Sequence, residues 1–151
     1  MSHNLEANKH HFENDRFVAA NGMRLLELRP GFAKTCLKVE DRHLNSIGTV
    51  HGGAIFTLAD FALGAAVMTG GKVAPAINTN LSFLKATRSG TLYAEATEIS
   101  RSRKLSVCTV NVTNDAGELV ALFQGTAYIK DEPFPPISEE DDEKENQSPS
   151  E

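Results

Sequence analysis

Residues 52–69 form the feature that most constrains this chain, because they have the pattern of an apolar helix that carries one charged residue, Asp60. Apolar side chains occupy nearly every face of that helix, and the pair Gly70 and Gly71 ends it. A helix that is apolar all round has to be buried. A membrane span is disfavoured, since the stretch only just reaches the necessary length and has a carboxylate in its middle. Small residues along the helix would allow close approach of a covering layer: Ala54, Ala59, Ala62, Gly64, Ala65 and Ala66.

The segments on either side of the helix have the alternating apolar and polar pattern of β-strands. The predicted strands cover residues 23–29, 33–40, 73–86, 91–101, 104–114 and 118–130. The first two form a candidate hairpin around Pro30 and Gly31, and the last four follow one another in meander order. No crossover helix separates those four strands, so the sheet should be antiparallel. We therefore predict an α+β fold in which one antiparallel sheet wraps around a long central helix.

Length and charge divide the chain into three parts. With 151 residues, 40% hydrophobic and 23% charged, it fits a single soluble domain of ordinary size, which we place at residues 23–130. Residues 1–22 are predicted to be a helical segment, with a short amphipathic helix over residues 10–20. Residues 131–151 hold nine acidic residues and one lysine, so we predict a disordered acidic tail.

The rest of the chain, residues 1–130, is mildly basic, with 14 basic and 11 acidic side chains and a net charge of +3. Such a body suits an anionic small ligand better than a nucleic-acid duplex, which usually needs a concentrated Lys/Arg face. Several basic residues fall within 20 positions: Lys85, Arg88, Arg101, Arg103 and Lys104. The alternative interpretation of this cluster is a solvated sheet edge that charge protects from aggregation.

The cysteines and the first residues favour a cytoplasmic protein. Cys36 and Cys108 are too few and too isolated for a disulfide framework, so we expect two buried thiols in a reducing compartment. Residues 1–14 lack the apolar stretch of a signal peptide. No membrane association is predicted.

Asp60 is the most informative residue, because a buried ionised acid is costly unless it is paired or has a chemical task. It lies two turns into the predicted helix, so it cannot be an N-cap, and no basic residue occurs three or four positions away. Removal from water should raise its pKa and make it a better base or nucleophile. The alternative is a structural acid that bonds to backbone or water.

The segment before the helix supplies a second polar element. Residues 43–53 read His-Leu-Asn-Ser-Ile-Gly-Thr-Val-His-Gly-Gly, so Gly52 and Gly53 stand at the helix start. Glycines there leave backbone N–H groups uncovered at the positive end of the helix dipole, where they can polarise a carbonyl oxygen. A tight entry turn is the alternative role for the pair.

The spacing of Gly52 and Asp60 bears on quaternary structure. They lie eight residues apart, which is about 12 Å along a helix, so one substrate carbonyl cannot touch both. If they act together, two copies of the helix must lie antiparallel, with Gly52 of one chain facing Asp60 of the other. We therefore predict a two-fold dimer with two sites at its interface.

Residues 51–60, His-Gly-Gly-Ala-Ile-Phe-Thr-Leu-Ala-Asp, preceded by Asn-Ser-Ile-Gly at 45–48, resemble the signature of the hot-dog-fold acyl-CoA thioesterases. The resemblance is to the PaaI-like, or phenylacetyl-CoA thioesterase, group, and it extends over residues 17–130, including 80–86, 90–96 and 117–121. It implies the hot-dog fold and hydrolysis of an aromatic (phenylacetyl-type) or medium-chain acyl-CoA to the free acid and CoA. It also implies a homodimer with shared active sites, assembled as a dimer of dimers.

The same resemblance implies roles for the motif residues. The N–H of Gly52 and the side chain of Asn45 would polarise the thioester carbonyl. Asp60 of the opposite chain would either deprotonate a water or attack the thioester to give a mixed anhydride. His51 would shape this corner and bond toward Asn45, or else be a structural loop histidine. Gly53 would contribute turn geometry beside the substrate.

One departure from the family pattern lies on the strand after the helix. Some relatives place a serine or threonine near the reactive water there, whereas this chain has Ala76, with Thr79 and Asn80 nearby. These three positions are therefore the substrate-binding candidates on that strand.

A second departure precedes the fifth strand, where relatives often have a glycine followed by a basic residue. This chain has Ser-Arg-Lys at 102–104 and so retains the charge. By resemblance we expect the nucleotide phosphates of CoA near Arg88, Arg103 and Lys104. High ionic strength should then weaken binding.

We predict no metal and no cofactor other than the CoA of the substrate. His3, His10 and His11 have no spaced cysteine or carboxylate to complete a metal shell, and no phosphate loop, dinucleotide fingerprint or serine elbow occurs. Two other functions stay open. One is a non-catalytic acyl-CoA-binding module, which Ala76 favours, and the other is a hot-dog dehydratase or hydratase that uses His51 and Asp60 as a pair.

Overall fold

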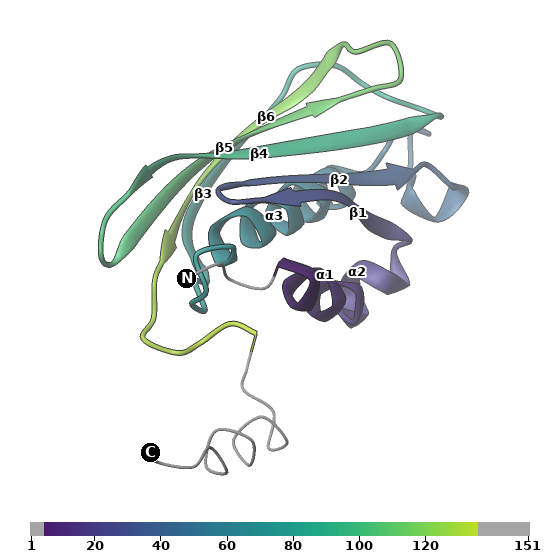
Figure 1. The fold of residues 1–151 in the computed structure, drawn as a ribbon. Helices are drawn as coiled ribbons and strands as arrows, with labels where there is room; N and C mark the ends of the chain where they lie inside the picture. Colours follow the sequence, from purple (N-terminus) through teal and green to yellow (C-terminus); the bar gives the residue numbers. More distant parts are fainter. Residues whose placement is uncertain (1–4, 136–151) are drawn as a thin grey trace, which may run out of the picture.

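The apolar segment forms helix α3, Gly52–Met68, which runs along one face of a curved sheet in the computed structural model of residues 5–135 (Figure 1). Most of the helix is buried against that sheet and the flanking helices, as the sequence predicts. The side chains that form this buried surface are Ile55, Leu58, Ala59, Phe61, Ala62, Leu63, Ala65, Ala66 and Val67. The small residues at 59, 62, 65 and 66 are 0% exposed, so they do allow close packing.

One stripe of α3 is not covered, although the sequence predicts burial on every face. It consists of residues four positions apart, which share one side of a helix: Gly52, Phe56, Asp60, Gly64 and Met68. Phe56 is 38% exposed, and the other members of the stripe are partly exposed. The sheet and the N-terminal helices cover most of the other sides, although Gly53 at the helix start is exposed and Ala54 and Thr57 are partly exposed. The stripe is therefore open to a ligand or a second chain.

The sheet has six strands, and every strand pairing in it is antiparallel. The strands are β1 (Met23–Arg29), β2 (Phe32–Lys38), β3 (Ala76–Phe83), β4 (Thr91–Arg101), β5 (Leu105–Thr113) and β6 (Leu119–Tyr128), in the order β1-β2-β4-β5-β6-β3. The predicted first hairpin and the antiparallel sheet are confirmed. The predicted meander is wrong for β3, which pairs with β6 at the far edge of the sheet. The reason is that β2 already occupies the edge of β4, as in the pairing of Cys36 with Tyr93.

Gly125 of β6 permits the close packing of α3 on the sheet. A Cβ atom at this position would collide with Leu63 Cδ1 and lie 3.2 Å from Phe123 Cε1, and both side chains are buried. Gly125→Ala should therefore lower the free energy of unfolding by about 1–3 kcal/mol through overpacking. Urea denaturation would measure this loss. Gln124→Ala, on the exposed face of the same strand, is the control, and equal stability of the two variants would contradict the packing role.

The predicted N-terminal helix is two helices, α1 (Leu5–Glu13) and α2 (Arg16–Ala20), which lie beside α3 and β1 (Figure 1). The break occurs because the Asp15 side chain accepts a hydrogen bond from Val18 N at 3.0 Å and so caps a new helix. Asn8 is fully buried and donates to the carbonyl of Met68, which anchors α1 on the end of α3. A one-turn 3-10 helix, η1 (Asp41–His43), follows β2.

The folded chain extends past the domain end predicted at residue 130. Phe134 is 5% exposed, and its ring centroid lies 5.1 Å from that of Phe12 in α1. Its N–H donates to the carbonyl of Gly71. The predicted boundary therefore falls too early, and the rest of the predicted acidic tail, residues 136–151, lies outside the described residues.

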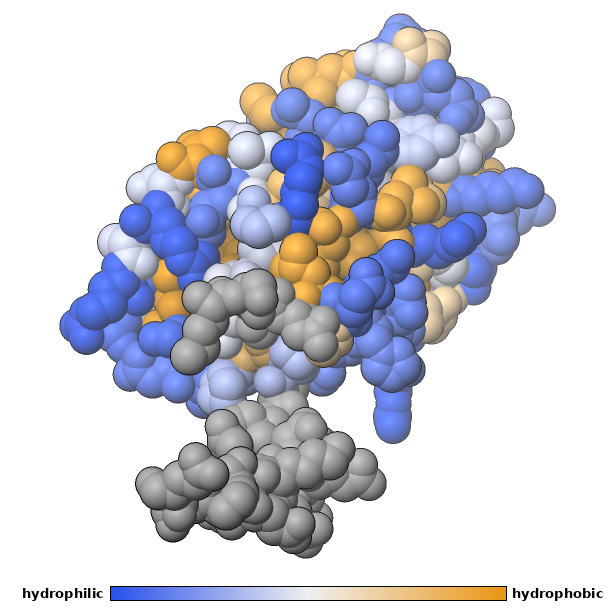
Figure 2. Space-filling model, in the orientation of Figure 1, coloured by the Kyte–Doolittle hydropathy of each residue, from blue (hydrophilic) through white to orange (hydrophobic). Residues whose placement is uncertain are grey.

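Hydrophilic residues separate the hydrophobic patches on the face of the molecule seen in Figure 2. In the described part of the chain, no helix is long and apolar enough to cross a membrane. Both cysteines are free thiols, but only Cys108 is fully buried, since Cys36 is partly exposed.

Candidate active site

The start of α3 leaves one backbone N–H group available. His51 is the N-cap, and its Nδ1 accepts a hydrogen bond from Gly53 N at 2.8 Å. The His51 carbonyl accepts from Ala54 and Ile55, so the next two N–H groups are also satisfied. Gly52 N–H makes no hydrogen bond within residues 5–135 and stands at the positive end of the helix dipole. His51 thus bonds to Gly53 rather than toward Asn45 and positions the turn that presents Gly52.

A tight loop before the helix holds Asn45 in place. The Asn45 Oδ1 accepts from the N–H groups of Ile47 and Thr49, each at 3.1 Å. Its Nδ2 donates to Thr49 Oγ1 at 2.8 Å, which leaves one amide hydrogen of Asn45 for another acceptor. The side chain is therefore fixed by three bonds before any ligand arrives.

Asn45 and Gly52 line the same cavity, which has a volume of about 390 Å³. Phe83 is part of its wall, and its ring lies so close to Gly52 that an added Cβ would be 2.9 Å from Phe83 Cζ. Thr87 also lines this cavity, and its buried hydroxyl has no hydrogen-bond partner among the described residues. The cavity therefore combines two free N–H donors with an aromatic wall.

Asp60 lies in a different cavity, between α3 and the segment that leads into β3. This cleft has a volume of about 570 Å³, and its walls are mainly apolar. Its lining residues are Phe56, Asp60, Leu63, Gly64, Met68, Ala74, Pro75, Ala76, Ile77, Asn78 and Thr79. Asp60 is the one charged residue in this lining. Gly52 and Asn45 are absent from it, so one chain does not bring all three together.

The environment of Asp60 favours its protonated form. Burial raises the pKa of the Asp60 carboxyl above its ordinary value of 3.8, and the nearby negative charge of Asp15 raises it further. No cation forms an ion pair with Asp60 within the part of the chain that the structure describes. This unpaired carboxyl with a raised pKa has the properties of a general base or nucleophile.

The raised pKa should make Asp60 lower the stability of the fold as pH increases. The folded chain holds this proton more tightly than the unfolded chain, so the stabilising contribution is complete below pH 3.8 and is lost as pH rises through the raised pKa. Asp60→Asn should therefore gain thermal stability relative to wild type as pH rises from about 3 to about 8. Melting curves of both proteins across that range test this. A difference in melting temperature that does not change with pH would contradict it.

The candidates on the strand after the helix are divided between two faces of the sheet. Ala76 and Thr79 line the Asp60 cleft. Asn80 pairs with Gln124 of β6, and because side chains alternate along a strand, it points to the face opposite Thr79. Asn80 lines neither of these two cavities within one chain, and its contact with the substrate stays a prediction.

The three basic residues predicted at the CoA phosphates are not neighbours within one chain. Arg88 Nη1 lies 3.3 Å from the Ile47 carbonyl, beside the Asn45 loop. Arg103 and Lys104 lie in the turn after β4, where Lys104 Nζ is 3.4 Å from Asp131. The length of β4, about 33 Å, separates the two locations. One chain alone does not form the predicted phosphate cluster.

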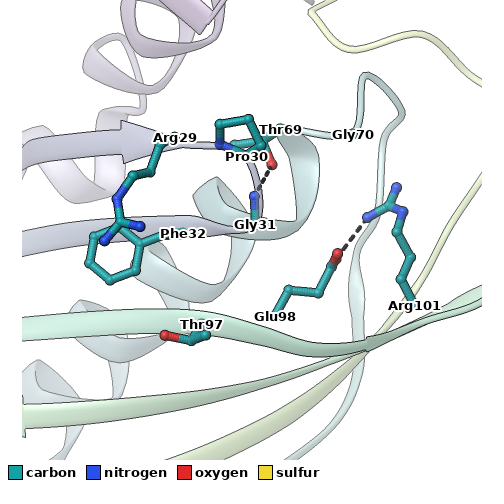
Figure 3. A pocket seen from close by; sticks show the side chains of 9 residues that line it. All are labelled: Arg29, Pro30, Gly31, Phe32, Thr69, Gly70, Thr97, Glu98 and Arg101. Atoms are coloured by element: carbon teal, nitrogen blue, oxygen red, sulfur yellow. Dashed lines mark hydrogen bonds and ion pairs between the residues drawn. The ribbon is translucent and has the colours of Figure 1, made fainter.

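A further cavity lies elsewhere and has the character of a structural cleft. It is lined by Arg29, Pro30, Gly31, Phe32, Thr69, Gly70, Thr97, Glu98 and Arg101, at the C-terminal end of α3 (Figure 3). Its charged groups are already partnered: Arg101 pairs with Glu98 at 2.8 Å, and the Arg29 guanidinium lies 3.8 Å from the centre of the Phe32 ring. None of the predicted site residues is among them, so we place the chemistry at the two cavities described above.

Sequence reasoning missed several cavity residues. Phe56, Gly64 and Met68 could have been found from their spacing of four from Asp60, which puts them on its side of the helix. Phe83 and Thr87 carry no comparable signal, because their place beside Gly52 depends on how β3 crosses α3. No group of three metal-ligating side chains occurs within residues 5–135.

Comparison with known proteins identifies the family. Residues 47–121 match the model of the thioesterase superfamily. A putative esterase of Archaeoglobus fulgidus is 39% identical over 128 residues, which make up 84% of this chain and 83% of that protein. The acyl-coenzyme A thioesterase PaaI of Escherichia coli is 32% identical over 130 residues, 85% of this chain and 93% of that one.

Solved structures agree with this assignment. The structure of Escherichia coli PaaI covers 85% of this chain and 95% of its own, with a TM-score of 0.81 and 31% identity. A hypothetical thioesterase of Streptococcus pneumoniae, solved with coenzyme A, matches 80% of this chain and 95% of its own, with a TM-score of 0.75 and 26% identity. This chain therefore belongs to the thioesterase superfamily, as a hot-dog-fold thioester hydrolase of the PaaI-like group.

Proposed function

We propose that this protein hydrolyses acyl-CoA thioesters, with an aromatic (phenylacetyl-type) or medium-chain acyl group, to the free acid and CoA. The observation that carries the proposal is an unpaired carboxyl, Asp60, in an apolar cleft of about 570 Å³, a volume that suits a small ligand. The relative PaaI is named an acyl-coenzyme A thioesterase, and it comes from the phenylacetic acid degradation operon of Escherichia coli. Both support an acyl-CoA with an aromatic acyl group.

In the proposed reaction, Gly52 N–H and Asn45 Nδ2 donate to the thioester carbonyl oxygen and stabilise the oxyanion that forms. By one route, Asp60 takes a proton from water while the water oxygen bonds to the carbonyl carbon. The C–S bond then breaks, and the proton passes to the leaving thiolate of CoA. By the other route, Asp60 attacks the carbonyl carbon, expels the thiolate and forms a mixed anhydride. Water then hydrolyses the anhydride to the free acid and the Asp60 carboxyl, whose proton passes to the thiolate of CoA. Either route uses water as the only co-reactant and no metal or cofactor.

The proposed site requires two chains, because Gly52 and Asp60 of one chain lie about 12 Å apart in separate cavities. In a two-fold dimer with antiparallel α3 helices, Gly52 of one chain faces Asp60 of its partner, and Phe56 lies at the axis. The uncovered stripe of α3 and the open edge of β3 support this arrangement, since both would otherwise remain unpaired. A dimer of dimers is the further assembly that the family resemblance implies.

The same arrangement would bring the basic residues Arg88, Arg103 and Lys104 close together. The C-terminal end of α3 in one chain comes opposite the Asn45 loop and Arg88 of the other. Lys104 belongs to that end, because it shares Asp131 with Lys72, which follows α3 closely. We therefore assign the CoA phosphates to Arg88 of one chain and to Arg103 and Lys104 of the other.

Arg88→Ala should raise KM for acyl-CoA by about tenfold, and high salt should have the same effect on wild type, because the contact is between exposed charges. Steady-state kinetics should be measured with the acyl-CoA and with the matching S-acyl pantetheine, which lacks the nucleotide phosphates. The comparison separates loss of the phosphate contact from a disturbance of the catalytic site. Arg29→Ala, in the cavity at the C-terminal end of α3, is the matched control. A KM increase with both substrates would show that Arg88 does not act on the phosphates.

Release of free thiol from acetyl-, hexanoyl- and phenylacetyl-CoA tests the proposed function. Wild type should react, and the rates should be higher with the two larger acyl groups. Calorimetric binding of acyl-CoA without thiol release would instead support a non-catalytic binding module. If no member of the panel binds and none releases thiol, the proposal is overturned.

A further inference from the structure

The described part of the chain ends beside residues that we assign to the CoA phosphates. After β6 the backbone runs antiparallel to the segment that follows α3, where Lys72 pairs with Pro133 and the N–H of Phe134 donates to the Gly71 carbonyl at 2.9 Å. Phe134 itself is 5% exposed. The chain is therefore held at the C-terminal end of α3, and residues 136–151 follow from that point.

A carboxylate of this chain contacts one of the assigned phosphate ligands. Asp131 lies 3.4 Å from Lys104 Nζ and 3.6 Å from Lys72 Nζ, and its side chain is 80% exposed. The hydrogen bond from Lys104, together with the charges of both lysines, holds the pKa of Asp131 below its usual range, so this group is ionised at neutral pH. Exposed ion pairs of this kind are weak, so another anion can replace the carboxylate.

Arg103 lies next to Lys104 and is still available. Its side chain is exposed, and it forms no ion pair among residues 5–135. Arg103 and Lys104 therefore make a small basic surface that an anion can approach from solvent. In the proposed dimer, Arg88 of the other chain faces the same surface.

The acidity that begins at Asp131 continues beyond the described residues. Residues 136–151 contain seven carboxylates and one lysine, a net charge of −6. Sixteen residues span at most about 55 Å when fully extended, so their carboxylates can reach the basic surface from the point where the chain is held. Because the segment is tethered, it meets that surface at an effective concentration that does not depend on the concentration of the protein. Both these carboxylates and the phosphates of CoA are attracted by the same cations.

We propose that residues 136–151 compete with the phosphates of CoA for Arg103 and Lys104, so that the acidic segment is a built-in electrostatic competitor of the substrate. The phosphates of CoA must displace its carboxylates, whereas a thioester without phosphates does not need these cations. The segment thus raises KM for acyl-CoA and leaves the chemistry at Asp60 unchanged. The inference rests on the proposed function and adds a regulation of substrate binding to it.

The test uses the full-length chain with the seven carboxylates of residues 136–151 replaced by amides: Glu139→Gln, Glu140→Gln, Asp141→Asn, Asp142→Asn, Glu143→Gln, Glu145→Gln and Glu151→Gln. At low ionic strength this neutralised chain should bind CoA about 5–10-fold more tightly by calorimetry, and its KM for hexanoyl-CoA should fall by a similar factor. Its kcat, and its KM for S-hexanoyl pantetheine, should equal those of wild type. Above about 0.5 M salt the two proteins should have the same affinity for CoA, because screening removes the competition.

Asp131→Asn tests the contact that the structure describes. It frees Lys104 and Lys72 from their carboxylate and should strengthen CoA binding by about twofold. Glu132→Gln is the matched control, because the partner of Glu132 is Lys130, at 3.5 Å, which is not among the residues assigned to the phosphates. This control should bind CoA as wild type does.

Two results would contradict the inference. One is a wild-type affinity for CoA at low ionic strength in both the neutralised chain and Asp131→Asn. The other is an equal fall in KM for hexanoyl-CoA and for S-hexanoyl pantetheine, since the second substrate carries no phosphate. The proposed function is judged separately, by release of thiol from wild type. If CoA affinity rises as expected but no thiol is released, the competition stands and the proposed hydrolysis fails.

Discussion

Replacing Asp60 with asparagine should lower kcat for thioester hydrolysis by about a thousandfold, because the substitution removes the only carboxylate that can take a proton or attack in the apolar cleft. Asparagine has nearly the same size and shape, so the packing of α3 is retained. Loss of a partly buried charge should also leave the fold at least as stable at neutral pH, since the raised pKa of Asp60 shows that its ionised form is disfavoured. Thiol release at saturating acyl-CoA measures the loss, and a melting curve confirms the fold.

Asp15→Asn provides the matched control. The substituted side chain would still cap α2, because asparagine is as good an N-cap as aspartate, yet the negative charge that helps to raise the pKa of Asp60 is removed. This variant should keep the plateau kcat of wild type, while the pH below which activity falls should move to a lower value. An Asp60→Asn protein with wild-type kcat would rule out both proposed routes.

Gly52→Pro should lower kcat by about 100–1,000-fold, because it removes the free N–H that stabilises the oxyanion. Proline fits the first position of a helix, and His51 before it has the extended conformation that proline requires, with φ −60 and ψ 136. Helix α3 should therefore still form. Kinetics and circular dichroism of the same preparation measure the two effects.

Gly52→Ala separates loss of the N–H from crowding. Both variants place a Cβ against the Phe83 ring, at 2.9 Å from its Cζ, and that ring is 58% exposed and free to turn away. Alanine keeps the N–H, so Gly52→Ala should retain most of the activity. Equal losses in the two variants would assign the effect to Phe83 rather than to the oxyanion.

Asp60→Asn and Gly52→Pro together also test whether two chains share one active site. A heterodimer of Asp60→Asn and Gly52→Pro has one site with both defects and one site with neither. Mixing the variants under conditions that exchange subunits should restore about a quarter of wild-type activity, since half of the dimers are mixed and each has one intact site. Activity that stays at the sum of the separate variants would place Gly52 and Asp60 in sites that do not combine.

Several elements were predictable because their signals are local. The bounds of β4 match the predicted residues 91–101, and α3 differs from its prediction by one residue at its end, since side-chain periodicity depends only on the neighbouring chain. The break between α1 and α2 was missed although it is also local. The Asp15 side chain accepts a hydrogen bond from Val18 N and so caps α2. An aspartate in the middle of a predicted helix is a local signal for such a cap.

The assignment of residues to cavities was less predictable. Thr79 and Asn80 are neighbours in sequence and are both candidates, but within one chain Thr79 lines the Asp60 cleft and Asn80 does not. The basic cluster in the sequence predicts one site for Arg88 and Lys104, whereas the intervening strand β4 holds them at opposite ends within one chain. In both cases proximity along the chain was a poor guide to proximity in space.

The sequence by itself determined that this chain has one long apolar helix with an isolated acid, a glycine at the helix start and an antiparallel sheet to cover it. These properties follow from local periodicity and from the free energy required to bury a charge. Only the tertiary structure decided that β3 lies at the far edge beside β6, that one stripe of α3 stays uncovered, and that Gly52 and Asp60 line separate cavities. The reason is that strand order and cavity shape arise from contacts between residues far apart in the chain, for which short-range patterns carry no information.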